Sequence, residues 1–141
     1  MNYTLEVVNV PVADIDVAKA FYGEKMGWPV DHDVAPAPGV RFVQITPPGS
    51  GCSIVLGGSS GMEPGSLKGL QLVVADIVAA HAELKGRGVE VGEVQAIDGD
   101  VAKLEQGGKA LDNVGFVFFS DPDGNGWAIQ QISRGPMCNS H

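Results

Sequence analysis

Few side chains in this sequence could bind a metal or carry a proton at neutral pH, and they do not cluster. The three histidines are widely separated: His32 ends a predicted strand, His81 falls in a predicted helix, and His141 is the last residue. Histidine is the side chain that titrates nearest to neutral pH, and it is a common metal ligand. Only His32 is placed where it could reach a cavity, and a surface position is the alternative for it.

Nucleophilic and acid–base chemistry finds little support in the sequence. No GxSxG elbow, phosphate-binding loop or dinucleotide fingerprint occurs. Cys52 has no activating neighbour in the sequence, so we expect it to be a small buried hydrophobic residue. Asp98, Asp100 and Asp112 fall in a segment without clear periodicity, where they could supply acid–base groups or be solvated loop carboxylates. The sequence therefore names no catalytic residue.

Residues 121–125, Asp-Pro-Asp-Gly-Asn, predict a tight turn between two strands. Proline fixes φ, glycine adopts positive φ, and Asp or Asn side chains bond to the nearby backbone. The spacing also imitates the first half of a calcium-binding loop. The twelfth position of that loop would be Ile132, where a bidentate carboxylate is needed. We therefore predict a turn and not a calcium site.

A four-residue word, Val-Ala-Asp-Ile, occurs at 12–15 and again at 74–77. Each copy follows an apolar run and opens a helical pattern that a glycine ends. The two helical patterns run over 14–26 and 76–86, and each begins with an aspartate suited to cap it. Because the flanks match as well as the word, the sequence predicts a duplicated module.

Each half of the sequence predicts a strand, a helix and then three more strands. Proline and glycine predict a loop over 35–39. A helical crossover makes the first strand of each half parallel to a neighbour, and hairpins complete the sheet. The predicted fold class is therefore α+β, with tandem βαβββ modules that form a curled mixed sheet around a ligand trough and carry their helices outside. The predicted strands cover 5–12, 28–34, 40–46, 52–56, 70–74, 89–91, 115–120 and 126–132.

The module boundaries follow from composition. The first module covers 1–57, a Gly- and Ser-rich linker covers 58–68, and the second module covers 69–133. Within the second module, residues 95–113 form an insertion, which is either a functional lid or an idle surface loop. Residues 134–141 are predicted to be a frayed tail, and the whole chain forms one structural domain.

Composition excludes several classes of partner. The formal net charge is −8, which argues against nucleic acid, permits a cationic small molecule, and also serves solubility alone. The longest apolar runs are strand-sized, so no membrane span or signal peptide is predicted. Cys52 and Cys138 are too few for a disulfide framework. The expected location is therefore the cytoplasm.

The segments above resemble the vicinal oxygen chelate superfamily, which includes glyoxalase I, extradiol dioxygenases and bleomycin-resistance proteins. The resemblance covers residues 3–133 and implies paired βαβββ modules, a ligand cavity inside a curled sheet, and a homodimer. It is carried by Val10-Pro11-Val12-Ala13-Asp14, Phe21-Tyr22, Met26-Gly27, Val73-Val74-Ala75-Asp76, Gly88-Val89 and Phe119-Ser120-Asp121-Pro122-Asp123-Gly124-Asn125.

Enzymes of this superfamily hold a divalent metal with His, Gln or Glu on the first and last strands of each module. The resemblance places two of these positions at Val7 and Gly69, neither of which has a ligating side chain. The closing-strand position falls at Ala128 or Gln130, and only Gln130 offers an oxygen. Since a catalytic metal needs about three protein ligands, we expect no metal and no cofactor. A shifted register would instead bring in Glu6, Asn9 or Gln71, giving an amide-rich site.

The resemblance then favours a small-molecule binding protein of the bleomycin-resistance type over an enzyme. The alternatives are a metal-dependent glyoxalase-like lyase, isomerase or dioxygenase with a degenerate metal site, and a metabolite-sensing accessory domain. The expected ligand is cationic or aromatic and lies in an apolar cavity with a few polar groups. Because Trp127 and Gln130 point to opposite faces of a regular strand, they cannot both line it. The candidate ligand-binding residues are Trp28, His32, Phe42, Gln44, Gln71, Phe116, Phe118, Trp127 and Gln130.

Overall fold

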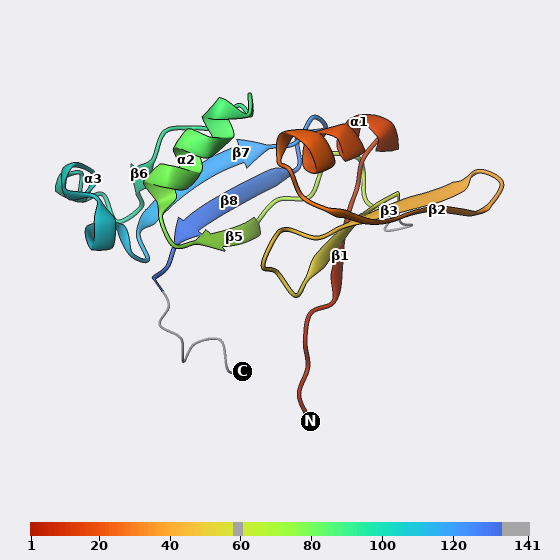
Figure 1. Cartoon of the computed structure of the whole chain (residues 1–141), viewed down its shortest axis with the longest axis horizontal. Coiled ribbons are helices and arrows are strands. Elements are labelled where there is room, and N and C mark those ends of the chain that lie inside the picture. Colours follow the sequence, from red (N-terminus) through yellow and green to blue (C-terminus); the bar gives the residue numbers. More distant parts are fainter. Residues whose placement is uncertain (58–60, 134–141) are drawn as a thin grey trace. The chain divides into compact units, whose positions relative to one another are not determined.

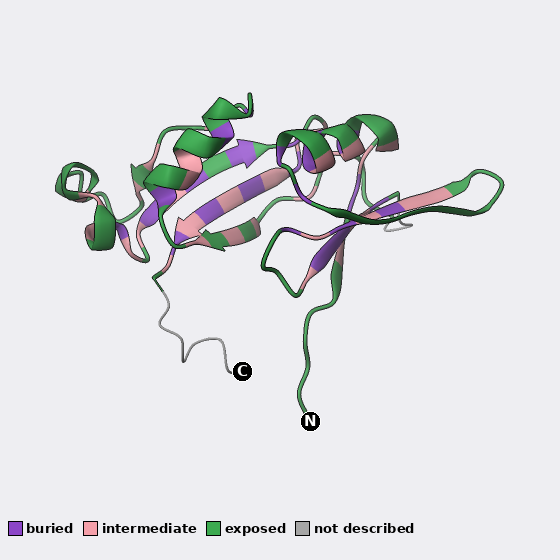
Figure 2. Ribbon diagram, in the orientation of Figure 1, coloured by how far each residue is buried: buried purple, intermediate pink, exposed green. Residues whose placement is uncertain are grey.

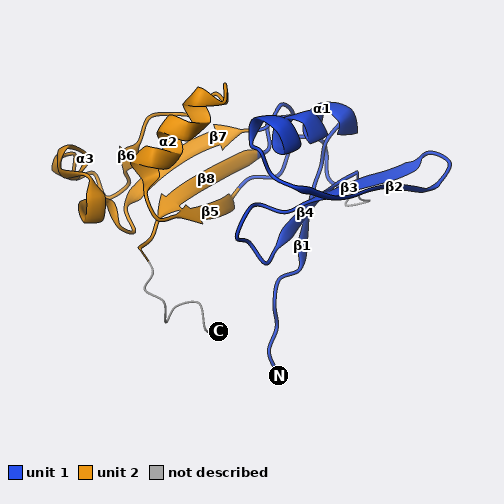
Figure 3. Ribbon diagram, in the orientation of Figure 1, with its two compact units in different colours: residues 1–68, 121–125 blue, residues 69–120, 126–141 orange. Residues whose placement is uncertain are grey.

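The computed structural model describes residues 1–57 and 61–133. The predicted tail over 134–141, with Cys138 and His141, and the linker residues 58–60 lie outside the described residues. Contacts group the chain into two compact units, shown in Figure 3. Among the described residues, the first holds 1–57 and 61–68 together with Asp121–Asn125, and the second holds Gly69–Ser120 and 126–133.

Each unit is built on a four-stranded mixed sheet (Figure 1). The strand order is β1-β4-β3-β2 in the first sheet and β5-β8-β7-β6 in the second, so the topology repeats. In both sheets the outer first strand pairs parallel with the last strand, and the other pairs are antiparallel. The predicted α+β class and the tandem βαβββ order are confirmed, and the trough between modules stays a prediction.

The elements of the first unit are β1 (Val7–Val10), α1 (Ile15–Lys19), the π-helical turn η1 (Ala20–Lys25), β2 (Val30–Ala37), β3 (Val40–Ile45) and β4 (Ser53–Leu56). Asp14 caps α1 as predicted, because its Oδ1 accepts a hydrogen bond of 3.2 Å from the Val17 backbone N–H. The helical path ends before Gly27, whose φ of 74° suits glycine. Its apolar side packs on one face of the first sheet, where Val43, Ile45 and Leu56 are fully buried.

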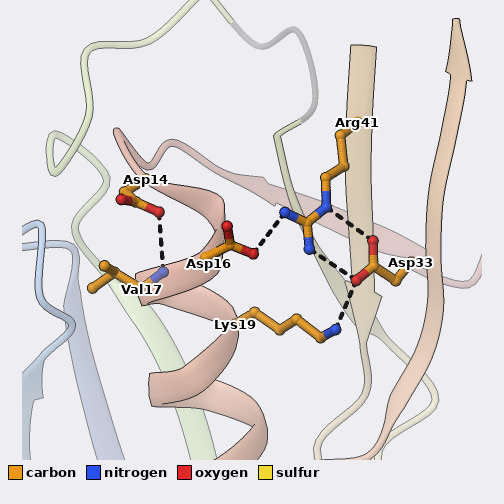
Figure 4. Close-up of polar contacts among 6 residues, drawn as sticks. All are labelled: Asp14, Asp16, Val17, Lys19, Asp33 and Arg41. Carbon is orange, nitrogen blue, oxygen red and sulfur yellow. Dashed lines mark hydrogen bonds and ion pairs between the residues drawn. The ribbon is translucent and has the colours of Figure 1, made fainter. Parts of the chain in front are cut away.

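An ion-pair network joins α1 to β2 and β3 of the first sheet on the same face (Figure 4). The Arg41 guanidinium donates to Asp16 of α1 at 2.7 Å and to both carboxylate oxygens of Asp33 on β2 at 2.9 and 3.0 Å. The Lys19 ammonium donates to the same Asp33 carboxylate at 2.7 Å. These partners lower the pKa of Asp33 and raise the pKa of Arg41, chiefly through the Asp33–Arg41 hydrogen bonds.

The loop predicted over 35–39 is wrong for most of its length. Strand β2 continues through Ala37, and only Pro38 and Gly39 form the turn into β3. Pro36 is tolerated because β2 is the edge strand of its sheet, where a missing N–H donor breaks no ladder. The register of β2 against β3 shifts between Val34 and Ala37, which marks a bulge at that proline.

The elements of the second unit are β5 (Leu70–Val74), α2 (Ile77–Gly86), β6 (Gln95–Ala96), α3 (Ala102–Gln106), the 3-10 turn η2 (Gly108–Leu111), β7 (Gly115–Ser120) and β8 (Gly126–Gln131). The Asp76 carboxylate caps α2 by accepting from the Ala79 N–H at 3.0 Å. The strand predicted over 89–91 is wrong, because Val89 donates its N–H to Leu84 in the end of α2 and only Val91 bridges to β7. The outer strand is instead β6, inside the predicted insertion.

Gln131 anchors the second unit from inside. This side chain is 2% exposed. Its Oε1 accepts from the first helical N–H of α2, at Ile77, while its Nε2 donates to the Gly108 carbonyl and the Asp112 carboxylate. One amide therefore ties β8 to both the start of α2 and the end of the insertion. The hydrogen bonds from Gln131 and Ser133 lower the pKa of Asp112.

The predicted turn at 121–125 is present and belongs to the first unit. The buried Asp121 carboxylate accepts three backbone N–H groups through Oδ1, and its Oδ2 accepts from the Tyr22 hydroxyl at 2.7 Å. Asn125 is fully buried and donates to Asp121 and to the Pro11 carbonyl. The aspartate oxygens are thus committed to local donors, which fits a turn.

None of the helices in the described ranges is long and apolar enough to cross a membrane.

Candidate ligand-binding site

The two faces of the second sheet differ in what covers them. A Cβ built on Gly115 would come within 3.1 Å of the Ile77 side chain, and Gln131 bonds to Ile77 as well, so the odd-numbered residues of β7 and β8 face α2. Val117 and Ile129 are accordingly buried. The even-numbered residues point to the other side by the period of two, and the colouring of β8 in Figure 2 shows the matching alternation of buried and half-buried residues. We call that side the helix-free face of the second sheet.

Strand register arranges the helix-free face in two rows across β5, β8 and β7. Gln71 lies opposite Ala128, which lies opposite Phe118. In the next row Val73 lies opposite Gln130, which lies opposite Phe116. The Phe116 and Phe118 rings stack, with centroids 5.8 Å apart and an interplanar angle of 13°. Phe118 is 40% exposed, so this aromatic pair is accessible on a folded surface.

The amides on this face form one chain of hydrogen bonds. Gln71 Nε2 donates to Gln130 Oε1 at 2.6 Å, and Gln130 Nε2 donates to the Asn113 carbonyl at 2.7 Å. Asn113 is held at a φ of 70°, the one positive φ outside glycine among the described residues. Its own N–H donates to the Gln131 carbonyl at 2.7 Å. The end of the insertion therefore fixes the polar side chains of the helix-free face.

The first sheet also has a helix-free face, carried by the other set of alternating residues. Phe42 lies opposite Val34 and Gln44 lies opposite His32, so Phe42 and Gln44 share a face. His32 and Val34 are exposed on the edge strand, and Phe42 and Gln44 are half-buried. Within the part of the chain that the structure describes, the Gln44 amide and the His32 ring make no hydrogen bond.

The structure thus gathers seven of the nine candidate residues on the two helix-free faces. Gln71, Gln130, Phe116 and Phe118 lie together in the second unit, and His32, Phe42 and Gln44 lie together in the first. The placement follows from the period of two along each strand. What any of these residues binds stays a prediction.

Trp28 and Trp127 are removed from this set. Trp127 is 4% exposed and stacks on Phe119 on the α2 side of the second sheet. Trp28 is buried against Tyr22, with ring centroids 5.6 Å apart. Both were predicted as trough walls because they are large and aromatic, but large aromatic side chains are equally suited to packing under a helix.

Trp28 instead borders a cavity on the helix side of the first unit, outside both helix-free faces. The cavity has a volume of about 490 Å³ and is open to solvent. Lys19 on its rim already pairs with Asp33. The remaining lining residues are Asp16, Ala20, Gly23, Glu24, Gly27, Pro29 and Val30.

The residues at the superfamily's metal positions do not fit a divalent metal. Val7 lies on β1 opposite Ser53 and brings only methyl groups. Gly69 precedes β5 with a φ of 88° and has no side chain. On the closing strand Ala128 and Gln130 do share the helix-free face, but the Gln130 oxygen already accepts from Gln71. Over residues 1–57 and 61–133, no three His, Cys, Asp or Glu side chains come together to hold a metal ion.

The other titratable candidates lie away from these faces or are already paired. His81 is half-buried on α2, and its Nε2 lies 3.9 Å from a carboxylate oxygen of Glu93. Asp98 pairs with Lys103 at 2.6 Å within the insertion, and this hydrogen bond lowers the pKa of Asp98 and raises that of Lys103. Cys52 is a half-buried free thiol.

Two members of the helix-free face were not among the candidates. Asn113 acts through its backbone carbonyl, for which the sequence carries no direct signal, although Asn is one of the few residue types other than glycine that are enriched at positive φ. Val73 is 41% exposed beside Gln130. The alternation of β5 could have revealed it, since Gln71 and Val73 are two residues apart.

The chain belongs to the Glyoxalase/Bleomycin resistance protein/Dioxygenase superfamily, whose pattern matches residues 4–129. Among solved structures it is similar to TnmS3, an antibiotic binding protein from Streptomyces sp. CB03234. The two share 33% identity and a TM-score of 0.73, covering 94% of this chain and 98% of that one.

Two further structures support the same class. A glyoxalase/bleomycin resistance protein from the same Streptomyces strain is 33% identical, with a TM-score of 0.70, over 91% of this chain and all of that one. A superfamily member from Sphaerobacter thermophilus DSM 20745 is 27% identical, with a TM-score of 0.70, over 92% of this chain and 98% of that one. A comparison with curated protein sequences finds no match.

Proposed function

We propose that this protein binds a small molecule and needs no catalytic metal to do so. The observation that carries the proposal is the helix-free face of the second sheet, where the stacked Phe116 and Phe118 lie in the same rows as Gln71 and Gln130. Binding sites for small molecules combine apolar and aromatic walls with a few fixed polar groups. The superfamily's metal positions, by contrast, hold Val7 and Gly69.

The proposed ligand is an antibiotic-like aromatic compound. A structure 33% identical to this chain is that of an antibiotic binding protein, which supports this class of ligand. Stacked aromatic side chains bind flat rings through offset or edge contacts. The net charge of −8 adds a preference for cationic over anionic compounds, through long-range attraction that salt screens.

The proposed setting is a cytoplasmic homodimer that binds neither nucleic acid nor membrane. Superfamily membership supports the dimer, and the acidic composition supports the exclusion of nucleic acid. Within each protomer we propose that residues 1–57 and 69–133 are the two modules and that 58–68 is their linker. The dimer is tested by sedimentation equilibrium over a range of protein concentrations, where a monomer at all concentrations contradicts it.

The proposed function is tested first by metal analysis and then by a ligand screen. Protein purified without chelator or nickel is expected to contain far less than one equivalent of zinc, iron, nickel or manganese. A thermal-shift screen of aromatic antibiotics should then raise Tm for some compounds, because a ligand that binds only the folded state stabilises it. The Phe118→Ala variant is expected to lose that shift, while the Val40→Ala variant, also exposed but on the first unit, keeps it.

A stoichiometric metal would contradict the metal-free proposal. Lyase, isomerase and dioxygenase assays would then test the alternative of a glyoxalase-like enzyme with a degenerate site. A screen in which no compound shifts Tm would contradict binding by the folded chain.

A further inference from the structure

We propose that the helix-free face of the second sheet selects ligands that donate a hydrogen bond, and that the Asn113 carbonyl sets this preference through Gln130 and Gln71. The chemical class is an aromatic compound with a hydroxyl or N–H group beside its ring. The inference rests on the proposed function, because a preference between ligands requires that the face bind one.

The direction of the hydrogen-bond chain is forced by its last member. A backbone carbonyl can accept a hydrogen bond but cannot donate one. Gln130 must therefore turn its Nε2 toward Asn113, and the contact of 2.7 Å fits this. Its Oε1 is then left to face Gln71, so Gln71 must turn its own Nε2 inward, as the 2.6 Å contact shows. The direction of both hydrogen bonds therefore follows from the fact that a carbonyl oxygen can only accept.

The consequence is that Gln71 presents its oxygen to a ligand. No residue in the described ranges donates to Gln71 Oε1, and the side chain is exposed. An amide oxygen with free lone pairs accepts from a hydroxyl, an amine or an ammonium group. A ligand that offers only an acceptor gains nothing from this oxygen and has only the second N–H of Gln71 Nε2 left to it, so it binds less tightly than a ligand that donates to the oxygen.

The register places this acceptor where an aromatic ligand could reach it. Gln71, Ala128 and Phe118 lie in one row across three adjacent strands. Adjacent strands are about 4.8 Å apart, so the Gln71 and Phe118 backbones are about 10 Å apart. Ala128, between them, has only a methyl side chain. A fused aromatic system over Ala128 could therefore contact Phe118 at one end and bring a polar substituent to Gln71 at the other.

Gln44 is a natural control for this argument. It is a half-buried glutamine on the helix-free face of the first sheet, but its amide makes no hydrogen bond among the described residues. Nothing there fixes which end of the amide a ligand meets. Gln44 can turn to suit either a donor or an acceptor, so it is expected to add no such preference.

The experiment compares two probes that share a ring system and differ in one polar group. Full-length protein labelled with nitrogen-15 and carbon-13 is titrated with 2-naphthol, which donates through its hydroxyl, and with 2-methoxynaphthalene, which only accepts. Binding is followed at the aromatic resonances of Phe116 and Phe118. We expect 2-naphthol to bind about tenfold more tightly, the effect of about one hydrogen bond.

Variants then separate the acceptor from the residues that position it. Gln71→Met should reduce the ratio of the two affinities to one or below, whereas Gln71→Glu keeps an acceptor and should keep the preference. Gln130→Met releases the Gln71 amide to turn, so both probes should still bind but with nearly equal affinity. Gln106→Met, at an exposed glutamine on α3, should leave the ratio as it is in the unmodified protein. A merely structural role for Gln130 would weaken both probes together and leave the ratio unchanged.

Three outcomes can be told apart. A tenfold preference that Gln71→Met and Gln130→Met abolish supports the inference. Equal binding of the two probes, or tighter binding of the ether, overturns the inference and leaves the proposed function standing. If neither probe shifts the Phe116 and Phe118 resonances, the proposed aromatic site is itself contradicted, and the inference is overturned with it.

Discussion

The two sheets of this protein share one topology but hold their polar side chains differently. On the first sheet, ion pairs lie on the helix side, where Arg41 joins Asp16 and Asp33, and among the described residues the Gln44 amide on the helix-free face makes no hydrogen bond. On the second sheet, the neutral side-chain amides of Gln130 and Gln131 form hydrogen bonds on the two opposite faces of β8. The difference lies in the insertion, whose end supplies the carbonyls and the carboxylate that the two amides bind.

That difference explains why duplication of a fold need not duplicate a site. Both modules contain the Val-Ala-Asp-Ile word, an aspartate cap and the same strand order. Among the described residues, a hydrogen-bond chain joins Gln71, Gln130 and the Asn113 carbonyl on the helix-free face of the second sheet, whereas Gln44 on the first joins no such chain. The four predictions below test this comparison, from the largest expected effect to the smallest.

The two faces of β7 should respond very differently to the loss of a ring. Phe119→Ala removes a side chain that is 5% exposed and stacked on Trp127, and should lower the free energy of unfolding by about 3–5 kcal/mol. Phe118→Ala, the matched change on the helix-free face, should cost about 1 kcal/mol or less. Urea unfolding followed by circular dichroism measures both. Equal losses would contradict the assignment of the faces.

Of the two neighbouring glutamines of β8, the buried Gln131 should contribute more to the free energy of unfolding than the exposed side-chain bonds of Gln130. Gln131→Leu removes the buried side-chain hydrogen bonds to the Ile77 N–H, the Gly108 carbonyl and Asp112, and should cost about 2–4 kcal/mol. Gln130→Leu removes exposed bonds and should cost about 1 kcal/mol or less. Unfolding midpoints in urea distinguish them. A larger loss of stability for Gln130→Leu would mean that the hydrogen bonds on the helix-free face, and not those of Gln131, hold the insertion in place.

The stability that the ion pairs of the first unit contribute should depend on pH and on salt, whereas the contribution of the amides of the second unit should depend little on salt. The pKa of Asp33 is lowered below its ordinary value of 3.8, so its stabilisation is present above that value and is lost as the pH falls below it. Asp33→Asn should therefore flatten the fall in stability at acid pH. About 1 M salt shortens the Debye length to about 3 Å and should shrink the effect of Asp33→Asn at neutral pH.

Asp112 provides the matched comparison in the second unit. The pKa of its carboxylate is also lowered, but by hydrogen bonds from the neutral Gln131 and Ser133 side chains. The effect of Asp112→Asn on the urea midpoint should therefore change little with salt. Equal salt dependence of the two variants would show that the contrast between ion pairs and amides does not govern stability.

The two helix caps should behave alike, since here the modules match. Asp14→Ala and Asp76→Ala each remove one side-chain bond to an N–H in the first helical turn, at 3.2 and 3.0 Å. Each should cost about 1 kcal/mol. Hydrogen exchange at the amides of α1 and α2 reports the two losses separately. A loss at one cap only would show that the repeated word no longer has the same role in both modules.

Much of the fold could be predicted because local chemistry and the period of two act in the same direction. Asp14 and Asp76 cap their helices, Leu70–Val74 and Gly115–Ser120 were predicted with the bounds that the structure has, and Phe116 and Phe118 share the face that their spacing implied. Strand β2 ran past Pro36 because edge position, which is a property of the whole sheet, decides whether proline is tolerated.

The candidate site was harder to predict, because face and partner depend on tertiary contacts. Alternation separates Trp127 from Gln130, but it does not say which of them the helix covers. The bonds of Gln130 to Asn113 and of Gln131 to Gly108 join β8 to an insertion whose sequence has no clear period. A backbone carbonyl carries no sequence signature, so the series of hydrogen bonds from Asn113 through Gln130 to Gln71 could be found only in the structure.

The central claim is that the helix-free face of the second sheet binds an aromatic ligand without a metal. The most direct test is the affinity of 2-naphthol, measured by calorimetry before and after exhaustive dialysis against EDTA, with Phe118→Ala protein in parallel. The account predicts the same Kd in both preparations and at least about tenfold weaker binding by Phe118→Ala. Binding that disappears with EDTA and returns with added zinc or iron, or binding that Phe118→Ala leaves unchanged, would contradict it.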